Sequence, residues 1–330
     1  PGGVLRAGRR VLARTEPRPA ETVRSTIEVP LQEAAVAALA GRLGGIAALD
    51  PRTGAVRALA GIAFSAPQPP GSTFKIVTTT AALEADLVKL SDDFPVETNA
   101  VIDGVELENA NGELCGGTFE EAFAESCNSV FGPLGVEVGA ARLVETAERY
   151  GWNSPPTLPG EAPSTLPDGE GIVSPLEVAS SAIGQFQTLA TPLQMASVAQ
   201  VVANAGVRVL PTLEAGAPVG PRRVRVTSKA VARTLERLMV AVVERGTGTA
   251  AAITGVTVAG KTGTAELEDT RGADGETRDG DPSNTDAWFT SYAPTDRPEI
   301  AVAVLLVRNG SGGSTAAPAA RTVLTAAVGE

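Results

Sequence analysis

The stretch Pro70-Gly71-Ser72-Thr73-Phe74-Lys75 decides more about this chain than any other. A Pro-Gly pair followed by apolar residues at helical spacing predicts a helix over Ser72–Leu90. Serine and lysine three positions apart lie on one helix face, and a serine needs a neighbouring base to act as a nucleophile. Lysine can be that base when burial or a second cation lowers its pKa. Ser72 and Lys75 are therefore a candidate nucleophile and general base, against the plainer interpretation of a helix-start serine and a surface lysine.

A second polar string, Ser126-Cys127-Asn128, follows some fifty residues later. It falls inside or at the end of a helix predicted over Thr118–Phe131, which Thr118 and Glu121 would open as a capping box. Residues two apart do not share a helix face. Ser126 and Asn128 can therefore reach one cleft only if the helix breaks or ends there, and a polar C-terminal turn is the plainer interpretation.

A third string, Lys261-Thr262-Gly263-Thr264, belongs to a strand predicted over Val256–Ala265. On a strand the two threonines share one face, and the lysine and the glycine share the other. A glycine inside a strand often marks the close approach of a ligand or of another backbone. The plainer interpretation is an edge strand that carries a protective lysine.

The same place also matches a nucleotide-binding pattern, because residues 255–262 read Gly255-Val256-Thr257-Val258-Ala259-Gly260-Lys261-Thr262. A phosphate-binding loop of that type needs a strand before it and a helix that opens at the lysine. Here the residues before Lys261 are themselves strand-like, and a glycine and an acidic segment follow. The nucleotide interpretation is therefore disfavoured.

Composition excludes several other chemistries. The 330 residues carry a net charge of −11, from 27 basic and 38 acidic residues, and show no basic run with interleaved aromatics, so no nucleic-acid partner is expected. With no histidine and only two cysteines, the chain has no Ser-His-Asp triad, no HExxH site and no CxxC pair, and neither a cofactor nor a metal is expected. No apolar run is long enough to span a membrane. A start at Pro1 suits a fragment, whose membrane anchor would lie outside this sequence.

Strand-like segments at both ends of the sequence, with helices between them, predict an α+β domain whose sheet joins the two ends. Residues 1–25 are expected to be an arm or the remnant of another domain, and residues 26–330 the main domain. The acidic segment Glu266–Asp286 is expected to be a solvated loop or a rim of the cleft. Further strands are predicted at Ile46–Leu49, Ala55–Ala60, Ala287–Ala293 and Ile300–Arg308, and further helices at Leu31–Leu43, 137–150, 174–184, 192–205, 228–245 and Thr315–Val328.

Taken together and in this order, the three strings resemble the SxxK, SxN and KTG motifs of penicillin-binding proteins and serine β-lactamases. Segments outside the motifs resemble the transpeptidase domain too, and residues 5–13 resemble the end of the N-terminal pedestal of class B members. The resemblance covers about residues 25–329. It implies a five-stranded antiparallel sheet flanked by helices, with an all-helical subdomain on one side of the active-site cleft. The resembling segments are Gln68–Lys75, which extends the first motif toward the N-terminus, and, outside the motifs, Gly184-Gln185, Thr191–Ala196, Asp286–Phe289 and Tyr292–Pro294.

The resemblance also implies catalytic roles. Ser72 would attack the carbonyl of a D-Ala-D-Ala stem peptide or of a β-lactam, Lys75 would be the general base, and Ser126 would relay the proton to the leaving group. The backbone N–H groups of Ser72 and Thr264 would form the oxyanion hole. Lys261 would set the electrostatics of the site and favour a neutral Lys75.

Substrate binding is implied for Asn128 and for the four neighbouring positions of the third string. Thr262 and Thr264, with Gly263 between them, would bind the terminal carboxylate beside Lys261, and Asn128 would bind the substrate amide. Two features depart from the family pattern. Cys115 and Cys127 are expected to form a disulfide or to remain two buried thiols, and Asp286 opens a segment in which relatives often carry histidine.

The function implied is a peptidoglycan D,D-transpeptidase outside the cytoplasmic membrane, membrane-associated in the full-length protein. Its partners would be stem peptides, β-lactams and other cell-wall synthesis proteins. A D,D-carboxypeptidase or β-lactamase and a β-lactam-sensing domain are the alternatives. No glutamate suited to activating a deacylating water is evident in residues 145–175, so slow deacylation is expected.

Overall fold

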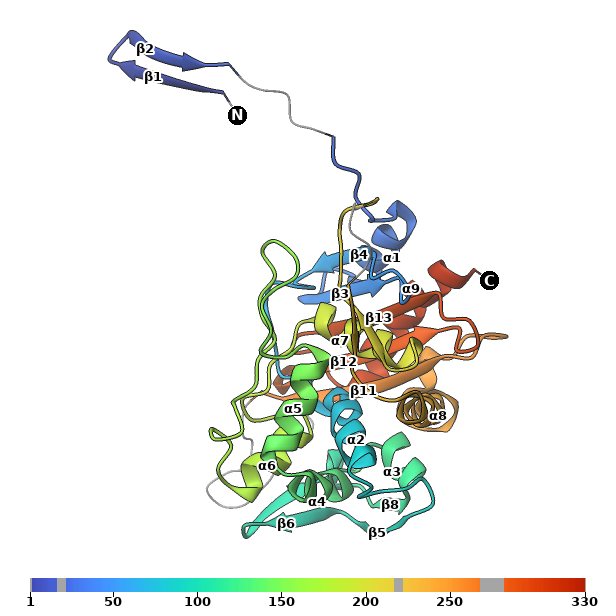
Figure 1. The fold of residues 1–330 in the computed structure, drawn as a ribbon. Coiled ribbons are helices and arrows are strands. Elements are labelled where there is room, and N and C mark those ends of the chain that lie inside the picture. The colour runs from blue at the N-terminus through green and yellow to red at the C-terminus, as the bar shows by residue number, and fades with distance from the viewer. Residues whose placement is uncertain (1, 17–21, 217–221, 268–281, 330) are drawn as a thin grey trace.

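A five-stranded antiparallel sheet forms the centre of the computed structural model, which describes residues 2–16, 22–216, 222–267 and 282–329 (Figure 1). Ala303, in a strand near the end of the chain, pairs with Ala47, in a strand near the start of the main domain. The two ends of the main domain therefore meet in the sheet. Both of these strands are apolar and buried along their whole length, which explains why the sequence predicted them. The strand order is β11 (Ala259–Glu266), β12 (Thr285–Ala293), β13 (Ile300–Leu306), β3 (Gly44–Leu49) and β4 (Val56–Gly61).

One face of the sheet is covered by two helices from opposite ends of the chain. α1 (Val29–Leu39) and α9 (Ala317–Val328) pack against each other and against β4 and β13. Five of the nine buried residues of these two helices are alanine, a small side chain that lets the helix backbones approach the sheet closely. A short π-helical turn, η5 (Gly312–Ala316), leads into α9 and lies against β11 and β12.

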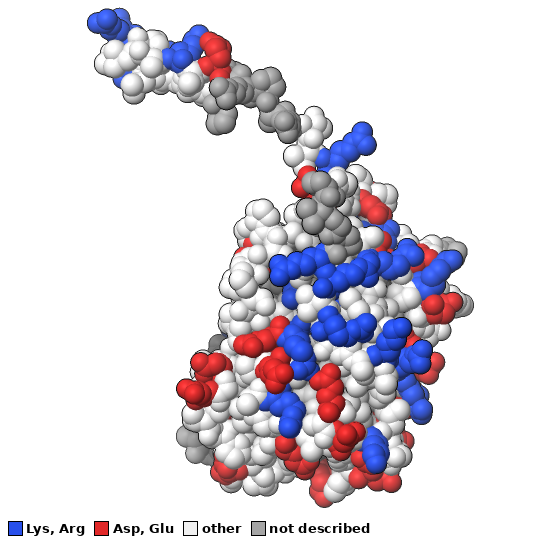
Figure 2. Space-filling model, viewed as in Figure 1, with Lys and Arg blue, Asp and Glu red and all other residues white. Residues whose placement is uncertain are grey.

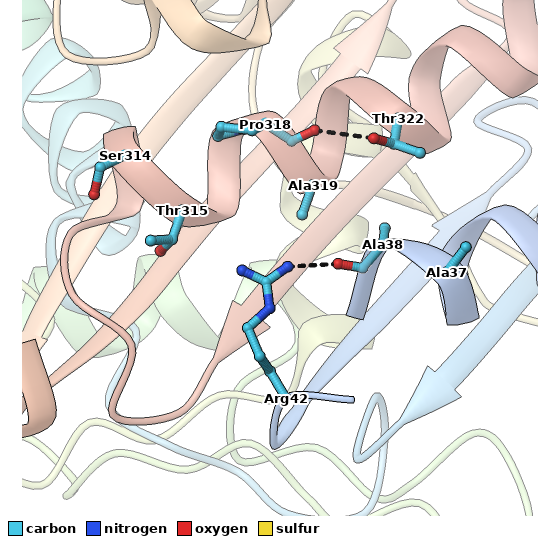
Figure 3. Close-up of a pocket in the computed structure, with 8 residues that line it drawn as sticks. All are labelled: Ala37, Ala38, Arg42, Ser314, Thr315, Pro318, Ala319 and Thr322. Atoms are coloured by element: carbon cyan, nitrogen blue, oxygen red, sulfur yellow. Dashed lines mark hydrogen bonds between the residues drawn. The ribbon is translucent and has the colours of Figure 1, made fainter. Parts of the chain in front are cut away.

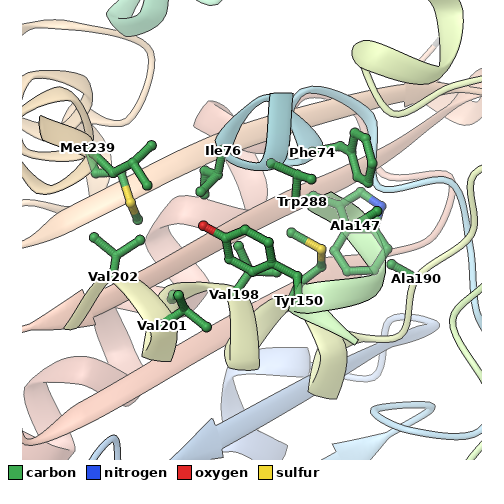
Figure 4. Packing of buried hydrophobic residues seen from close by; sticks show 14 of the residues in the cluster. Phe74, Ile76, Ala147, Tyr150, Ala190, Val198, Val201, Val202, Met239 and Trp288 are labelled. Atoms are coloured by element: carbon green, nitrogen blue, oxygen red, sulfur yellow. The ribbon is translucent and has the colours of Figure 1, made fainter. Parts of the chain in front are cut away.

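The other face carries the larger hydrophobic core. α7 (Pro192–Ala203) crosses β3, β12 and β13, while α8 (Lys229–Arg245) lies along β11 and α2 (Lys75–Glu84) packs against α8. Figure 4 shows this core, in which Phe74, Tyr150, Val198, Met239 and Trp288 come together from different elements. α7 is buried at nearly every position because it lies between the sheet and the other helices. The end of α2 that bears Lys75 is thereby held in place by the packed core on this face.

The helical side of the domain holds α3 (Phe119–Ala124), α4 (Asn128–Val138), α5 (Ala140–Tyr150) and α6 (Pro175–Ala182). Four short strands accompany these helices, and the sequence had not predicted them. They form two two-stranded sheets, which pair β5 (Asp93–Glu97) with β8 (Cys115–Thr118) and β6 (Asn99–Ile102) with β7 (Val105–Glu108). The remaining predicted helices and strands are found within a few residues of their expected places.

The helix predicted over Ser72–Leu90 is shorter than expected. The 3-10 turn η1 (Gly71–Phe74) precedes α2, and α2 ends at Glu84. Asp86 then takes a left-handed backbone with φ of 53°, and the N–H of Leu87 donates to the carbonyl of Ala82. This hydrogen bond caps the helix and turns the chain away, which the helical pattern in the sequence did not reveal.

The single helix predicted over Thr118–Phe131 is wrong. Its start is confirmed, because Thr118 and Glu121 form the reciprocal capping box. The helix ends at Ala124, however, and α4 begins only at Asn128. Between them Ser126 adopts a left-handed conformation with φ of 67°, so the Ser-Cys-Asn string is the break between two helices.

The N-terminal arm forms a hairpin of β1 (Gly3–Ala7) and β2 (Arg10–Thr15), in which every residue is exposed. Figure 1 shows it standing apart from the main body, and the domain boundary at residue 25 stays a prediction. A further short hairpin, β9 (Val207–Val209) with β10 (Arg223–Arg225), was not predicted. Most of the acidic segment, 268–281, lies outside the described residues.

The surface charges are unevenly distributed. On the face shown in Figure 2, Lys and Arg gather in a band across the upper body, and Asp and Glu gather toward the helical end. Within the described part of the chain, no helix has the length and apolar character that crossing a membrane requires.

Candidate active site

Ser72 lies in the η1 turn directly before α2, half-buried at the junction of the helix and the sheet. The turn is held by the Thr73 hydroxyl, which donates to the Pro70 carbonyl at 2.7 Å. Phe74 anchors the turn in the core through an edge-on contact with Trp152, in which the two ring centroids are 5.2 Å apart. The Ser72 hydroxyl makes no hydrogen bond with a described residue, and the role of Lys75 as its general base stays a prediction.

Two glycines let this turn press against β11. Gly71 has a φ of 52°, and a Cβ there would lie 2.7 Å from the carbonyl oxygen of Thr264. A Cβ on Gly263 would lie 2.7 Å from the carbonyl oxygen of Pro70. The close backbone approach predicted for Gly263 is confirmed, and it brings Ser72 next to the strand that carries the third motif.

Lys75 is the first residue of α2, and its side chain is fully buried. Its Nζ lies 2.7 Å from the Ser126 carbonyl oxygen, 3.2 Å from Ser126 Oγ and 2.7 Å from Asn128 Oδ1. The Phe131 ring lies beneath it, with its centroid 5.2 Å from Nζ. The first and second motifs are therefore in direct contact, and the helix break at Ser126 allows both Ser126 and Asn128 to face the same lysine.

Lys261 reaches the same serine from the sheet. Its Nζ donates to Ser126 Oγ at 2.8 Å and to the carbonyl oxygen of Thr262 at 3.2 Å. The side chain is fully buried and lies against the ring of Phe123. Ser126 Oγ thus lies between two buried lysine amines, which joins all three motifs in one cluster.

Burial changes the acid-base behaviour of both lysines. The pKa of Lys75 is held well below its usual range, first by burial and then by the charge of Lys261. Burial lowers the pKa of Lys261 to about 7, although the carboxylate of Glu125 opposes this shift. The shift at Lys75 favours a neutral amine there near neutral pH, the state that a general base needs.

The remaining predicted residues lie around this cluster. Asn128 fixes its amide by donating from Nδ2 to the Glu108 carbonyl at 2.8 Å while its oxygen accepts from Lys75. Thr264 Oγ1 accepts from the N–H of Gly312 at 3.3 Å. Thr262 is buried and shares a 2.6 Å hydrogen bond with Thr247, a residue that the sequence had not singled out.

Cys115 and Cys127 are joined by a disulfide, which decides between the two alternatives left open by the sequence. Cys127 is the residue between Ser126 and Asn128, and Cys115 begins β8. The covalent bond therefore ties the helix break to a neighbouring strand.

The nucleotide-binding interpretation is wrong, because Lys261 and Thr262 lie inside β11 and no helix opens there. A phosphate-binding loop needs its lysine at a helix start. Figure 3 shows a shallow groove elsewhere, between α1 and α9, where Arg42 faces Thr315 and Ala319. That groove lies across the sheet from α2 and contains no residue of the motif cluster.

We expect Lys261→Met to move the pH dependence of acylation by a β-lactam toward higher pH. Lys75 can accept a proton only when unprotonated, so the rate rises with pH through the pKa of Lys75. The positive charge of Lys261 lowers that pKa. Removing the charge raises the pKa of Lys75, so the part of the rate profile that rises with pH (the rising limb) moves to higher pH. Acylation rates across a pH series measure it, with exposed Lys229→Met as the control. An unmoved limb would contradict the prediction, whatever the amplitude of the rate.

Comparison with known proteins agrees with this geometry. A family model described as the penicillin binding protein transpeptidase domain matches residues 44–325. The peptidoglycan D,D-transpeptidase PbpA of Mycolicibacterium smegmatis is 36% identical over 293 residues, which are 81% of this chain and 56% of that protein. PbpA of Mycobacterium tuberculosis is 35% identical over 294 residues, with the same two shares. This chain belongs to the penicillin-binding protein transpeptidase family. It spans little more than half the length of these curated relatives.

Solved structures agree as well. The crystal structure of PBPA from M. tuberculosis superposes with a TM-score of 0.81 at 31% identity, covering 93% of this chain and 80% of that one. The ceftriaxone acyl-enzyme complex of the same protein gives a TM-score of 0.82 at 31% identity, with the same coverage of both chains. The D,D-transpeptidase domain of a peptidoglycan glycosyltransferase from Eggerthella lenta gives 0.82 at 32% identity, covering 92% and 82%.

Proposed function

We propose that this chain is the catalytic domain of a peptidoglycan D,D-transpeptidase that works through an acyl-enzyme on Ser72. The observation that carries the proposal is the cluster of Lys75, Ser126 and Lys261, directly behind the turn that presents Ser72. It supplies a buried amine as base without any histidine. The curated relatives named as peptidoglycan D,D-transpeptidases, and the ceftriaxone acyl-enzyme of the related PBPA, support it.

The hydrogen-bond partners of Lys75 suit a neutral amine. Two of the three acceptors around Nζ, the Ser126 carbonyl and Asn128 Oδ1, can only accept. A neutral amine would give one hydrogen to each and keep its lone pair for a hydroxyl. Lys261, when protonated, donates to Ser126 Oγ, which leaves the Ser126 hydrogen to point at Lys75. Protons would thus pass along a short ordered chain.

The reaction then follows in two half-steps. Ser72 Oγ attacks the carbonyl carbon of the penultimate D-alanine, and its proton passes to Lys75. The C–N bond breaks, and the leaving D-alanine amine takes a proton from Ser126, which regains one from Lys75. The amine of a second stem peptide attacks the ester and loses its proton to the same chain. A new amide forms, and Ser72 recovers its hydrogen.

The strand β11 would hold the substrate during both half-steps. Thr262 and Thr264 would bind the terminal carboxylate beside Lys261, and the backbone N–H groups of Ser72 and Thr264 would stabilise the oxyanion. The near contact of Gly71 with the Thr264 carbonyl supports this pairing, because it sets the two backbones side by side. Losing one such donor costs a rate factor on the order of 100.

Several broader assignments belong to the same proposal. Residues 26–330 form the catalytic domain, and residues 1–25 are an N-terminal arm or the remnant of a pedestal domain. The full-length protein acts outside the cytoplasmic membrane, to which it is attached, and Asn128 also contacts the amide of the stem peptide. Other cell-wall synthesis proteins are its partners.

The test is incubation with benzylpenicillin, followed by intact mass and peptide mapping. We expect one adduct of the full penicillin mass, on Ser72, that persists for long compared with the time of its formation. Rapid loss of the adduct would favour a β-lactamase. A stable adduct without acyl transfer from a D-alanyl thioester to a D-amino acid would favour a sensing domain. No adduct on Ser72 would refute the proposal.

A further inference from the structure

Thr247 lies in the connector after α8 and contacts both walls of the site. Its hydroxyl is 2.6 Å from Thr262 Oγ1 and 3.2 Å from the carbonyl oxygen of Ala124, the last residue of α3. Its backbone N–H also donates to that carbonyl, at 3.2 Å. A Cβ on Gly246 would lie 2.4 Å from the Ala124 oxygen, and one on Gly313 would lie 2.4 Å from the Thr247 oxygen. The connector is therefore closely packed, and Thr247 has a fixed place.

Counting hydrogens shows that the hydroxyl pair has two arrangements. Each threonine hydroxyl has one hydrogen, and the Ala124 carbonyl can only accept. If Thr247 donates to Ala124, the hydrogen of Thr262 must point at Thr247 and away from a ligand. If Thr247 donates to Thr262, the hydrogen of Thr262 is free. The Ala124 oxygen stays satisfied in both cases, because it keeps the N–H of Thr247.

We propose that Thr247 is a positioning residue for the carboxylate of the substrate, acting by donating its hydrogen to Thr262. Thr262 can then give its own hydrogen to the carboxylate, while its oxygen stays held by Thr247. Only two hydroxyl rotations separate the unliganded arrangement from this one. Thr264 needs no such partner, because its oxygen accepts from the Gly312 N–H and its hydroxyl donates to no residue in the part of the chain that the structure describes. The inference rests on the proposed function, in which Thr262 and Thr264 bind that carboxylate.

The test compares Thr247→Ala with Thr247→Ser, which differ only in the hydroxyl. Acylation of Ser72 is measured with benzylpenicillin and with its methyl ester, which lacks the carboxylate charge. We expect Thr247→Ala to be acylated by the free acid about tenfold more slowly than Thr247→Ser, the effect of one lost hydrogen bond. With the ester the two variants should react nearly alike. Thr249→Ala is the matched control, because Thr249 is exposed two residues further on.

Two results would overturn the inference, and a third would refute the proposed function beneath it. Equal slowing of the acid and the ester in Thr247→Ala would mean that Thr247 only supports the packing of α3 on β11. Equal rates for Thr247→Ala and Thr247→Ser with the free acid would mean that its hydroxyl has no part in binding. Absence of acylation in the unchanged protein, by acid and ester alike, would instead refute the proposed function on which the inference rests.

Discussion

Lys75→Met is expected to slow acylation of Ser72 by a factor on the order of 100 to 10,000, the contribution typical of a positioned general base. Methionine keeps the length of the side chain and suits the buried site, but it can neither accept the serine proton nor donate to Ser126 and Asn128. The time course of labelling by a fluorescent penicillin measures the rate. The adduct should still form on Ser72, only slowly, because the turn and β11 remain.

The matched control is Lys89→Met, since Lys89 is exposed and lies beyond the end of α2. It should label at the unchanged rate. The slow labelling of Lys75→Met should also lose the rising limb of its pH dependence, because the group whose ionisation produces that limb is gone. A Lys75→Met variant that labels as fast as the control would show that another group takes the proton.

The sheet and the three motifs could be predicted because their signals are local or consist of strong patterns. β3 and β13 are continuous apolar runs, and a buried strand of that kind is hard to mistake when turn residues bound it. The strand at Lys261 was recognisable from the alternation of apolar and polar residues before it, although the same residues also match a nucleotide-binding pattern. Only the element that contains them decides between the two, and β11 is a strand.

The helix break at Ser126 could not be predicted from the sequence. From the sequence it followed only that Ser126 and Asn128 would reach one cleft if the helix broke or ended there. Nothing in the local sequence ends α3 at Ala124, because no proline or glycine stands there, and Glu125 is a good helix former. The left-handed Ser126 is accompanied by a local helix-end hydrogen bond, in which the Cys127 N–H donates to the carbonyl of Ala122 at 2.9 Å. From outside the helix it is held by the disulfide of Cys127 and by the contacts with Lys75 and Lys261. Such a conformation depends on tertiary contacts.

Thr247 was missed for a related reason. Its importance comes from a contact with Thr262 and from the backbone of Ala124, which is more than a hundred residues away in sequence. A threonine between two glycines resembles an ordinary connector. The glycines do carry a signal, since Gly246 is required by close packing against Ala124, but the sequence alone does not say against what.

The double variant Cys115→Ala/Cys127→Ala is expected to lose about 3 kcal/mol of unfolding free energy, the value typical of a disulfide that closes a loop of this size. The two cysteines are 12 residues apart, and both are buried, so alanine avoids placing a new polar group in the core. Urea unfolding of the unchanged and variant proteins measures the loss. Reductant should weaken the unchanged protein in the same direction and leave the double variant as it is.

The same variant should be acylated by benzylpenicillin about 10- to 100-fold more slowly, even well below its unfolding temperature, because small misplacements of catalytic groups cost rates of that order. Cys127 separates the two residues that contact Lys75, and without the tether to β8 the break between α3 and α4 gains freedom. Stability and rate need not change together. A variant that is less stable but reacts at the unchanged rate would mean that the Lys75 and Lys261 hydrogen bonds alone hold Ser126 in place, and that the disulfide serves only the fold.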